Sequence, residues 1–159
     1  MTTRAEDYTI GWICAIPTEF VVACELLDEE YGRDRIPNVD TQRDSNSYRF
    51  GRLHEHNVVI ACLSRGRYGT TSAAIVAERM QWSFPAIRFG LMVGIAGGAP
   101  SHEHDIRLGD VVVSSLTPGY GGVIQYDFGK AVENYEFQET GHLAPPPEVL
   151  LNALLNIAM

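Results

Sequence analysis

A nearly unbroken apolar run, Tyr8 to Ile16, ends at Pro17 and limits the possible folds more than any other segment. A run with so few polar residues predicts a β-strand that is buried on both faces, as in the parallel sheets of α/β proteins. Pro17 suits the first turn of a helix, and Glu19 to Leu27 carries apolar side chains at helical spacing. The segment therefore predicts a buried strand followed directly by a helix.

Strand-like and helix-like segments alternate along the rest of the chain. Two β-prone runs flank a short polar turn, which favours a hairpin, and a Gly-containing break precedes a run with helical spacing. This alternation predicts an α/β layer architecture. The expected elements are a hairpin of Tyr48–Leu53 and Val58–Leu63, a helix over Thr70–Met80 capped by Thr70 or Thr71, strands over Phe89–Ile95 and Asp110–Leu116, and a helix over Glu148–Ala158.

Charge and cysteine usage exclude several classes of protein. The 159 residues include 12 Lys and Arg against 20 Asp and Glu, a net charge of −8, which argues against nucleic acid and anionic membranes as partners. Cys14, Cys24 and Cys62 lie in apolar surroundings without metal-site spacing, so we interpret them as reduced core residues. The first residues do not resemble a secretory signal, and we expect a cytoplasmic protein.

Two histidine clusters contain the residue types that bind metals. His54 and His56 form one pair, and His102, His104 and their acidic neighbours form the other. Both clusters lie in predicted polar turns, where solvated side chains are the usual outcome. We therefore expect no metal site.

The segment Ser64–Ser72 is a candidate anion-binding loop. It combines Arg65 and Arg67 with two glycines and several hydroxyls, ahead of a predicted helix N-terminus. An ordinary strand-to-helix turn with exposed arginines explains the same residues equally well, because the segment matches no established phosphate-binding motif.

Two further candidates follow predicted buried strands. Small residues from Val93 to Ala99 would let a flat ring lie against the backbone at the carboxyl end of a strand, where ligands collect in α/β folds. A turn between two elements is the alternative. Glu19 lies just beyond the first strand, where a general base can be placed, although a solvated glutamate in the first helical turn is the commoner situation.

Together these segments resemble the nucleoside phosphorylase and nucleosidase superfamily. The similarity is greatest to the versions that form N-terminal domains of fungal multidomain proteins resembling NLR receptors. It rests on five segments in the family's order, and it covers residues 8–159, leaving 1–7 as a flexible N-terminus. The segments are Ile10–Phe20, Gly66–Ala74, Phe89–Pro100, Asp105–Ser114 and Gly121–Lys130.

The resemblance implies a three-layer α/β/α sandwich with a central mixed sheet and cleavage of the N-glycosidic bond of a purine-type nucleoside. It implies Glu19 as the catalytic residue that orients and deprotonates water. It also implies a homo-oligomer and no cofactor beyond phosphate as a co-substrate. The implied substrate-binding residues are Gly66, Arg67, Thr71, Ser72, Ile95, Ala96 and Gly97.

Hydrolysis is slightly favoured over phosphorolysis by the same resemblance. Met92 stands where bacterial phosphorylases carry a phosphate-binding arginine, and a methionine cannot hold phosphate. Phosphorolysis stays open, because Arg65, Arg67 and the hydroxyls of Thr71 and Ser72 offer another anion site.

The chain also departs from the family pattern. The family's later Met-Glu pair and the aspartate that protonates the purine have no counterpart before Met159, so we expect a truncated domain with little or no activity as this fragment. The alternative is a non-catalytic module that senses nucleosides or drives oligomerisation. A Rossmann-like or flavodoxin-like binding domain is disfavoured, because no phosphate fingerprint follows the first strand.

Overall fold

A computed structural model describes residues 2–102, 104–116, 121–124, 129–131, 137–139 and 143–157. The chain divides into two compact units, Met1–Gly97 and Gly98–Met159. The first contains the 3-10 turn η1 (Ala5–Asp7), β1 (Ile10–Cys14), α1 (Pro17–Glu25), β2 (Glu29–Glu30), β3 (Tyr48–Leu53), β4 (His56–Cys62), α2 (Thr70–Ser83) and β5 (Phe89–Met92). The second contains β6 (Gly129–Ala131), β7 (Phe137–Glu139) and α3 (Glu148–Ile157).

The first unit is built on a mixed five-stranded sheet in the order β2-β3-β4-β1-β5. Strand β1 lies between β4 and β5 and is parallel to both, with Trp12 opposite Ile60 on one side and Leu91 on the other. The chain crosses from β4 through α2 to β5, on the far side of β1. The predicted buried parallel strand is therefore confirmed, and so is the β3–β4 hairpin, which is antiparallel.

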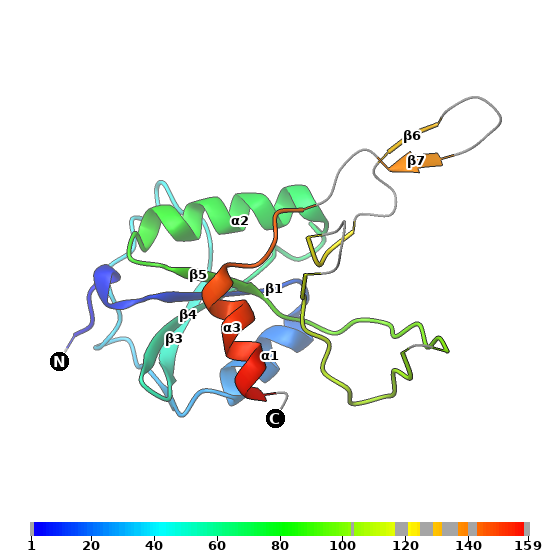
Figure 1. Ribbon diagram of the computed structural model, residues 1–159. Helices are drawn as coiled ribbons and strands as arrows, with labels where there is room; N and C mark the ends of the chain where they lie inside the picture. The colour runs from blue at the N-terminus through cyan, green and yellow to red at the C-terminus, as the bar shows by residue number, and fades with distance from the viewer. Residues whose placement is uncertain are drawn as a thin grey trace. The chain divides into compact units, whose positions relative to one another are not determined.

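Successive side chains of the central strands enter two different cores. Val59 and Ala61 of β4 pack with Val76 and Met80 of α2, and Val58 and Ile60 pack with Ala23 of α1. Because neighbouring residues of a strand point to opposite faces, the two helices cover opposite sides of the sheet (Figure 1). The first unit thus has the predicted three layers.

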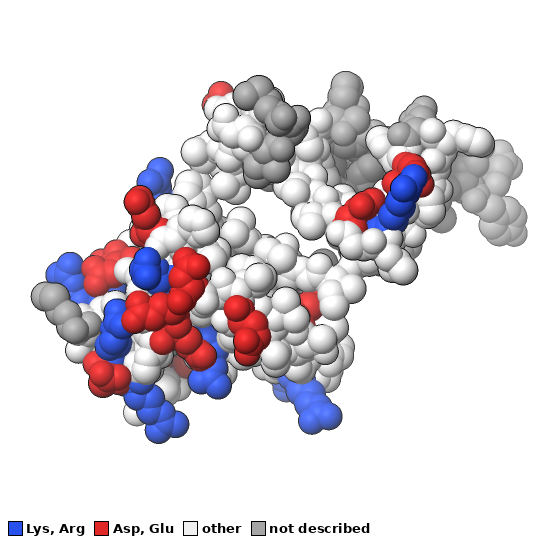
Figure 2. Space-filling view, turned by 90° about the horizontal axis from the view of Figure 1, so that it is seen from below, with Lys and Arg blue, Asp and Glu red and all other residues white. Residues whose placement is uncertain are grey.

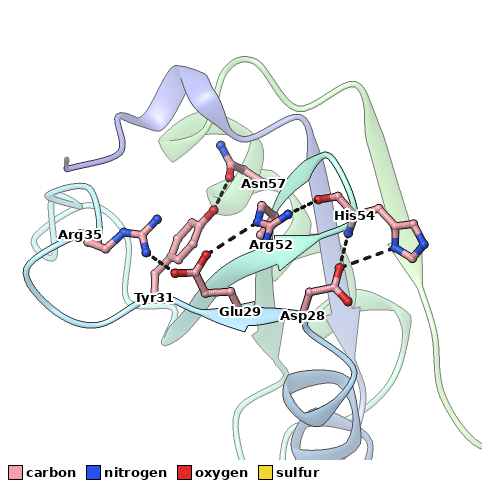
Figure 3. A network of polar contacts seen from close by, with 7 residues as sticks. All are labelled: Asp28, Glu29, Tyr31, Arg35, Arg52, His54 and Asn57. Atoms are coloured by element: carbon pink, nitrogen blue, oxygen red, sulfur yellow. Dashed lines mark hydrogen bonds and ion pairs between the residues drawn. The ribbon is translucent and has the colours of Figure 1, made fainter.

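A polar network fastens the segment between α1 and β3 (Figure 3). Glu29 forms ion pairs with Arg35 and, at 3.7 Å, with Arg52. The Tyr31 hydroxyl donates a 2.7 Å hydrogen bond to Asn57 Oδ1. This polar connection is held against the β3–β4 hairpin by side chains from both elements.

Three local expectations were wrong. No strand forms over Asp110–Leu116, because a β-prone run needs a neighbouring strand to pair with and the described residues offer it none. The strand expected over Phe89–Ile95 ends at Met92. The N-cap of α2 is Gly69, with φ of 98°, rather than either threonine. That backbone conformation is accessible to glycine and strained for threonine.

In the second unit, β6 and β7 pair antiparallel, with Lys130 opposite Gln138. The predicted C-terminal helix is present as α3, and its first turn includes a hydrogen bond from the Leu150 amide to the Pro147 carbonyl. Ala158, at the predicted end of this helix, lies outside the described residues.

Charged side chains are interspersed on the surface. In Figure 2, acidic and basic side chains alternate over the charged part of the visible face instead of forming separate single-sign patches. No helix in the described part of the chain has the length and apolar character needed to cross a membrane.

Candidate functional site

The carboxyl ends of the three parallel strands meet at one edge of the sheet. The segment after β1 leads into α1, the segment after β4 forms the glycine loop (defined here as Leu63–Gly69), and the segment after β5 carries Val93–Gly97. The pairing continues past the strands, since Leu63 donates to the Cys14 carbonyl and Val93 to the Ile13 carbonyl. Ligands of α/β sheets bind at this kind of edge.

Glu19 joins two of these segments. Its Oε2 accepts hydrogen bonds from the amides of Ala15 at 2.8 Å and Ile16 at 3.0 Å, while Oε1 accepts one from the Ile95 amide at 2.8 Å. The bond from Ile16, the N-cap of α1, is the usual arrangement for an acidic residue at the third helical position. The side chain therefore caps the helix and also holds the strand-end segment in place.

The environment of Glu19 favours its charged form. The residue is only 8 % exposed, and this burial acts to raise the pKa of its carboxyl group. The hydrogen bonds from the amides of Ile95, Ile16 and Ala15 together outweigh burial, so the pKa is lowered. A carboxylate has about four acceptor positions, and the three amides leave about one free for a water molecule.

Gly94 is required beside this carboxylate. A Cβ atom added at Gly94 would overlap Oε1 of Glu19, so even alanine would displace the carboxylate or the strand end. Gly97, by contrast, has no atom within 4 Å of an added Cβ. The small residues after β5 thus make room for Glu19 at one point and leave open space at another.

The backbone after β5 is only partly free to bind a ring. The Ile95 amide is already used by Glu19, whereas Ala96 and Gly97 are exposed. Of the three residues expected to form a floor for a purine, Ile95 is thus tied to the catalytic candidate. The backbone groups of Ala96 and Gly97 remain accessible to a ligand.

The glycine loop lies at the same edge and presents two cations. Gly66 and Gly69 adopt φ values of 80° and 98°, which favour glycine. Arg65 and Arg67 are exposed, and neither side chain has an ion pair or hydrogen bond within the described ranges.

Thr71 and Ser72 lie in the first turn of α2, directly after this loop. Among the described residues, no hydrogen bond links the loop or these hydroxyls to Glu19. The structure thus brings Glu19 and Ile95 into contact and places the expected anion-binding residues separately along the edge.

A cavity of about 310 Å³ opens beside the first turn of α1. Pro17 and Phe20 form one wall of the cavity. Ser45, Asn46 and Ser47 form a second, serine-containing wall. Cys62, at the end of β4, and Arg65, in the glycine loop, complete the lining. The serine-containing wall was missed by sequence reasoning. Only a short polar run before β3 marks it in the sequence.

The cysteines and histidines that the structure describes form no second chemical centre. Burial raises the pKa of Cys14 to about 12, so its thiol is a poor nucleophile at neutral pH. His54 is in an exposed turn, and within the described residues no three His, Cys, Asp or Glu side chains are grouped to hold a metal ion. Glu103, next to His102 and His104, lies outside those residues.

Comparison with known proteins identifies the family. Residues 9–159 match the family model of the phosphorylase superfamily. An NLR-like protein of the fungus Hyaloscypha variabilis, described as a nucleotide-binding leucine-rich repeat-like protein, is 49 % identical over 152 residues. That match covers 96 % of this chain and 15 % of the relative. No solved structure matches. With nearly all of its length matched, this chain belongs to the phosphorylase superfamily.

Proposed function

We propose that this chain carries the water-activating side of a site that cleaves the N-glycosidic bond of purine-type nucleosides. The observation that supports this most is the Glu19 carboxylate, held by three backbone amides at the carboxyl edge of the sheet with one acceptor position left. A residue fixed in this way can hold a water molecule in one orientation beneath the sugar, which is a large part of catalysis by positioning.

In the proposed reaction, water attacks C1′ of the ribose and the bond from C1′ to the base nitrogen breaks. Glu19 accepts a hydrogen bond from the water and takes its proton as the new C–O bond forms. The electron pair of the broken bond leaves with the base, which an acid must protonate. The lowered pKa of Glu19 keeps it ionised and makes orientation of the water its larger contribution.

Water is the favoured nucleophile. Met92, at the end of β5, is 59 % exposed at the edge where the resemblance expects a phosphate-binding arginine. Its thioether offers no positive charge to an anion. Arg65 and Arg67 nevertheless keep phosphate available as an alternative nucleophile.

A non-catalytic module is the second candidate function. The relative that matches this chain is an NLR-like protein, and the matched region is only 15 % of its length. Val21 and Val22 of α1 and its C-cap residue Leu26 are each more than half exposed, an apolar surface that suits contact with another segment or chain. In that case the site would bind nucleosides without turning them over.

The first test measures release of free base by the full-length gene product. Adenosine, guanosine and methylthioadenosine are each incubated with and without phosphate, and the base is quantified by chromatography. We expect release of free base without phosphate. Glu19→Gln should lower the rate at least ~100-fold, the usual size of a general-base contribution.

The matched control is Glu25→Gln, which changes an exposed glutamate of the same helix. It should leave the rate unchanged. Strict dependence on phosphate would contradict hydrolysis. Binding of nucleosides to folded protein with no release of base would favour the non-catalytic module.

A further inference from the structure

The glycine loop presents two arginines ahead of a threonine. Arg65 and Arg67 lie five and three residues before Thr70, which is the first residue of α2. No other serine or threonine in the sequence has an arginine three residues before it. The stretch 56–77 contains neither Asp nor Glu, although the whole chain has a net charge of −8. The loop is therefore a local basic segment that leads to one particular hydroxyl group.

The backbone of the loop holds this segment at the surface. The Arg67 amide donates a 2.9 Å hydrogen bond to the Ser64 carbonyl, which closes a turn whose third residue is Gly66, with φ of 80°. Glycine is the residue that a turn of this kind favours at that position. Residues 64–71 are all exposed. Both arginines and Thr70 are therefore accessible to a second protein.

The side chains of this segment are not engaged elsewhere. Across the residues that the structure describes, the Thr70 hydroxyl has no hydrogen bond, and the guanidinium groups of Arg65 and Arg67 have neither an ion pair nor a hydrogen bond. An enzyme that binds these three side chains does not have to break an existing contact first. The guanidinium groups are free to pair with carboxylates of such an enzyme.

The first turn of α2 can open without disturbing the core. Its N-cap residue, Gly69, makes no side-chain hydrogen bond to the helix, and the buried residues of α2, Val76 and Met80, lie beyond the first turn. Because the ends of helices open at a low free energy, Thr70 can leave the helix while the core contacts of α2 persist. The loop and Thr70 can then adopt the extended conformation in which protein kinases bind their substrates.

We propose that Thr70 is a phosphorylation site for an arginine-directed protein kinase. Kinases of this class use carboxylates to recognise guanidinium groups at this spacing before the acceptor hydroxyl. In the reaction, Thr70 Oγ1 attacks the γ-phosphorus of ATP, and the bond from that phosphorus to the oxygen that bridges it to the β-phosphorus breaks. ADP leaves with the electron pair of that bond, and the hydroxyl proton passes to a carboxylate of the kinase.

The phosphate introduces negative charge beside the two arginines. A phosphothreonine carries a charge of about −1.5 to −2 at neutral pH, and Arg65 and Arg67 can form charge-assisted hydrogen bonds with it. The first turn of α2 contains no acidic residue that would repel it. Thr71 and Ser72, two of the expected substrate-binding residues, follow directly in the chain. The phosphorylation site itself does not depend on the proposed function.

The test incubates the folded full-length gene product with protein kinase B and ATP, and tandem mass spectrometry quantifies the phosphate on Thr70. We expect Thr70 to be phosphorylated, and Thr70→Ala to lose this signal. Arg67→Gln should lower the rate at which Thr70 is phosphorylated at least ~10-fold, the effect of losing one good charge-assisted hydrogen bond. Arg33→Gln, which removes an exposed arginine outside the loop, should leave that rate unchanged.

Three outcomes would overturn the proposal. The first is the absence of phosphate from Thr70, and the second is a rate that is the same in Arg67→Gln as in wild type. The third is phosphorylation of Thr70 only after heat denaturation, because the site must be accessible in the folded protein. None of these measurements uses a nucleoside, so failure of the proposed function would leave their result unaffected.

Discussion

Two runs of β-branched residues in this chain have similar composition and opposite environments. Val58, Val59 and Ile60 of β4 are each 0 % exposed, whereas Val111, Val112 and Val113 are 87 %, 75 % and 53 % exposed. Strand β4 has β1 on one side and β3 on the other, and the second run has no strand partner among the described residues. A run of residues with high β-propensity therefore forms a strand only where neighbouring strands and a covering helix are present.

The comparison is tested most severely by shortening one side chain in each run. Ile60→Ala should lower the free energy of unfolding by about 2–5 kcal/mol, because it leaves a cavity between β4 and α1. Val112→Ala should change it by less than about 0.5 kcal/mol, as expected for an exposed site. Urea denaturation measures both, and similar losses in the two variants would show that the second run is also packed.

The same contrast between buried and exposed groups applies to carboxylates. Asp44→Ala should destabilise the first unit by about 2–4 kcal/mol, because it leaves the Tyr48 and Ser83 hydroxyls and the Asn46 amide without their acceptor. Asp34→Ala, at an exposed position, should have little effect. The measurement is again urea denaturation, and equal effects would mean that the Asp44 network contributes little to stability.

The smallest expected effect is the pH dependence that comes from Glu19. Its pKa is lowered in the folded protein, so the carboxylate contributes stability above its ordinary pKa of 4.5 that is lost as the pH falls through the folded value. Glu19→Gln should thus be less stable than wild type near neutral pH, and the difference should shrink below about pH 4.5.

Thermal unfolding at a series of pH values measures this difference, with Glu25→Gln as the exposed control on the same helix. A difference that stays constant or grows on acidification would mean that the amides do not stabilise the ionised form of Glu19.

Most of the secondary structure of the first unit could be predicted from the sequence. The apolar run before Pro17, the hairpin and the helix after the glycine loop each carry their signal within a few neighbouring residues, and all three are present. One failure occurs where the signal depends on distant partners, because Asp110–Leu116 has strand propensity without a neighbouring strand among the described residues. The failure at the cap of α2 is local, because the positive φ of Gly69 makes that glycine the N-cap.

The sequence by itself determined the family and the alternation of strands and helices, and it marked Glu19 as the carboxylate that follows the first strand. Only the tertiary structure decided what Glu19 contacts. The crossover from β4 through α2 places β5 beside β1, and this brings the Ile95 amide to a carboxylate 76 residues earlier in the chain. The serine-containing wall of the cavity is likewise fixed by tertiary contacts, since Asp44 accepts hydrogen bonds from the Tyr48 and Ser83 hydroxyls. Hydrogen bonds between distant segments leave no periodic pattern in the sequence, so the sequence alone did not reveal this wall.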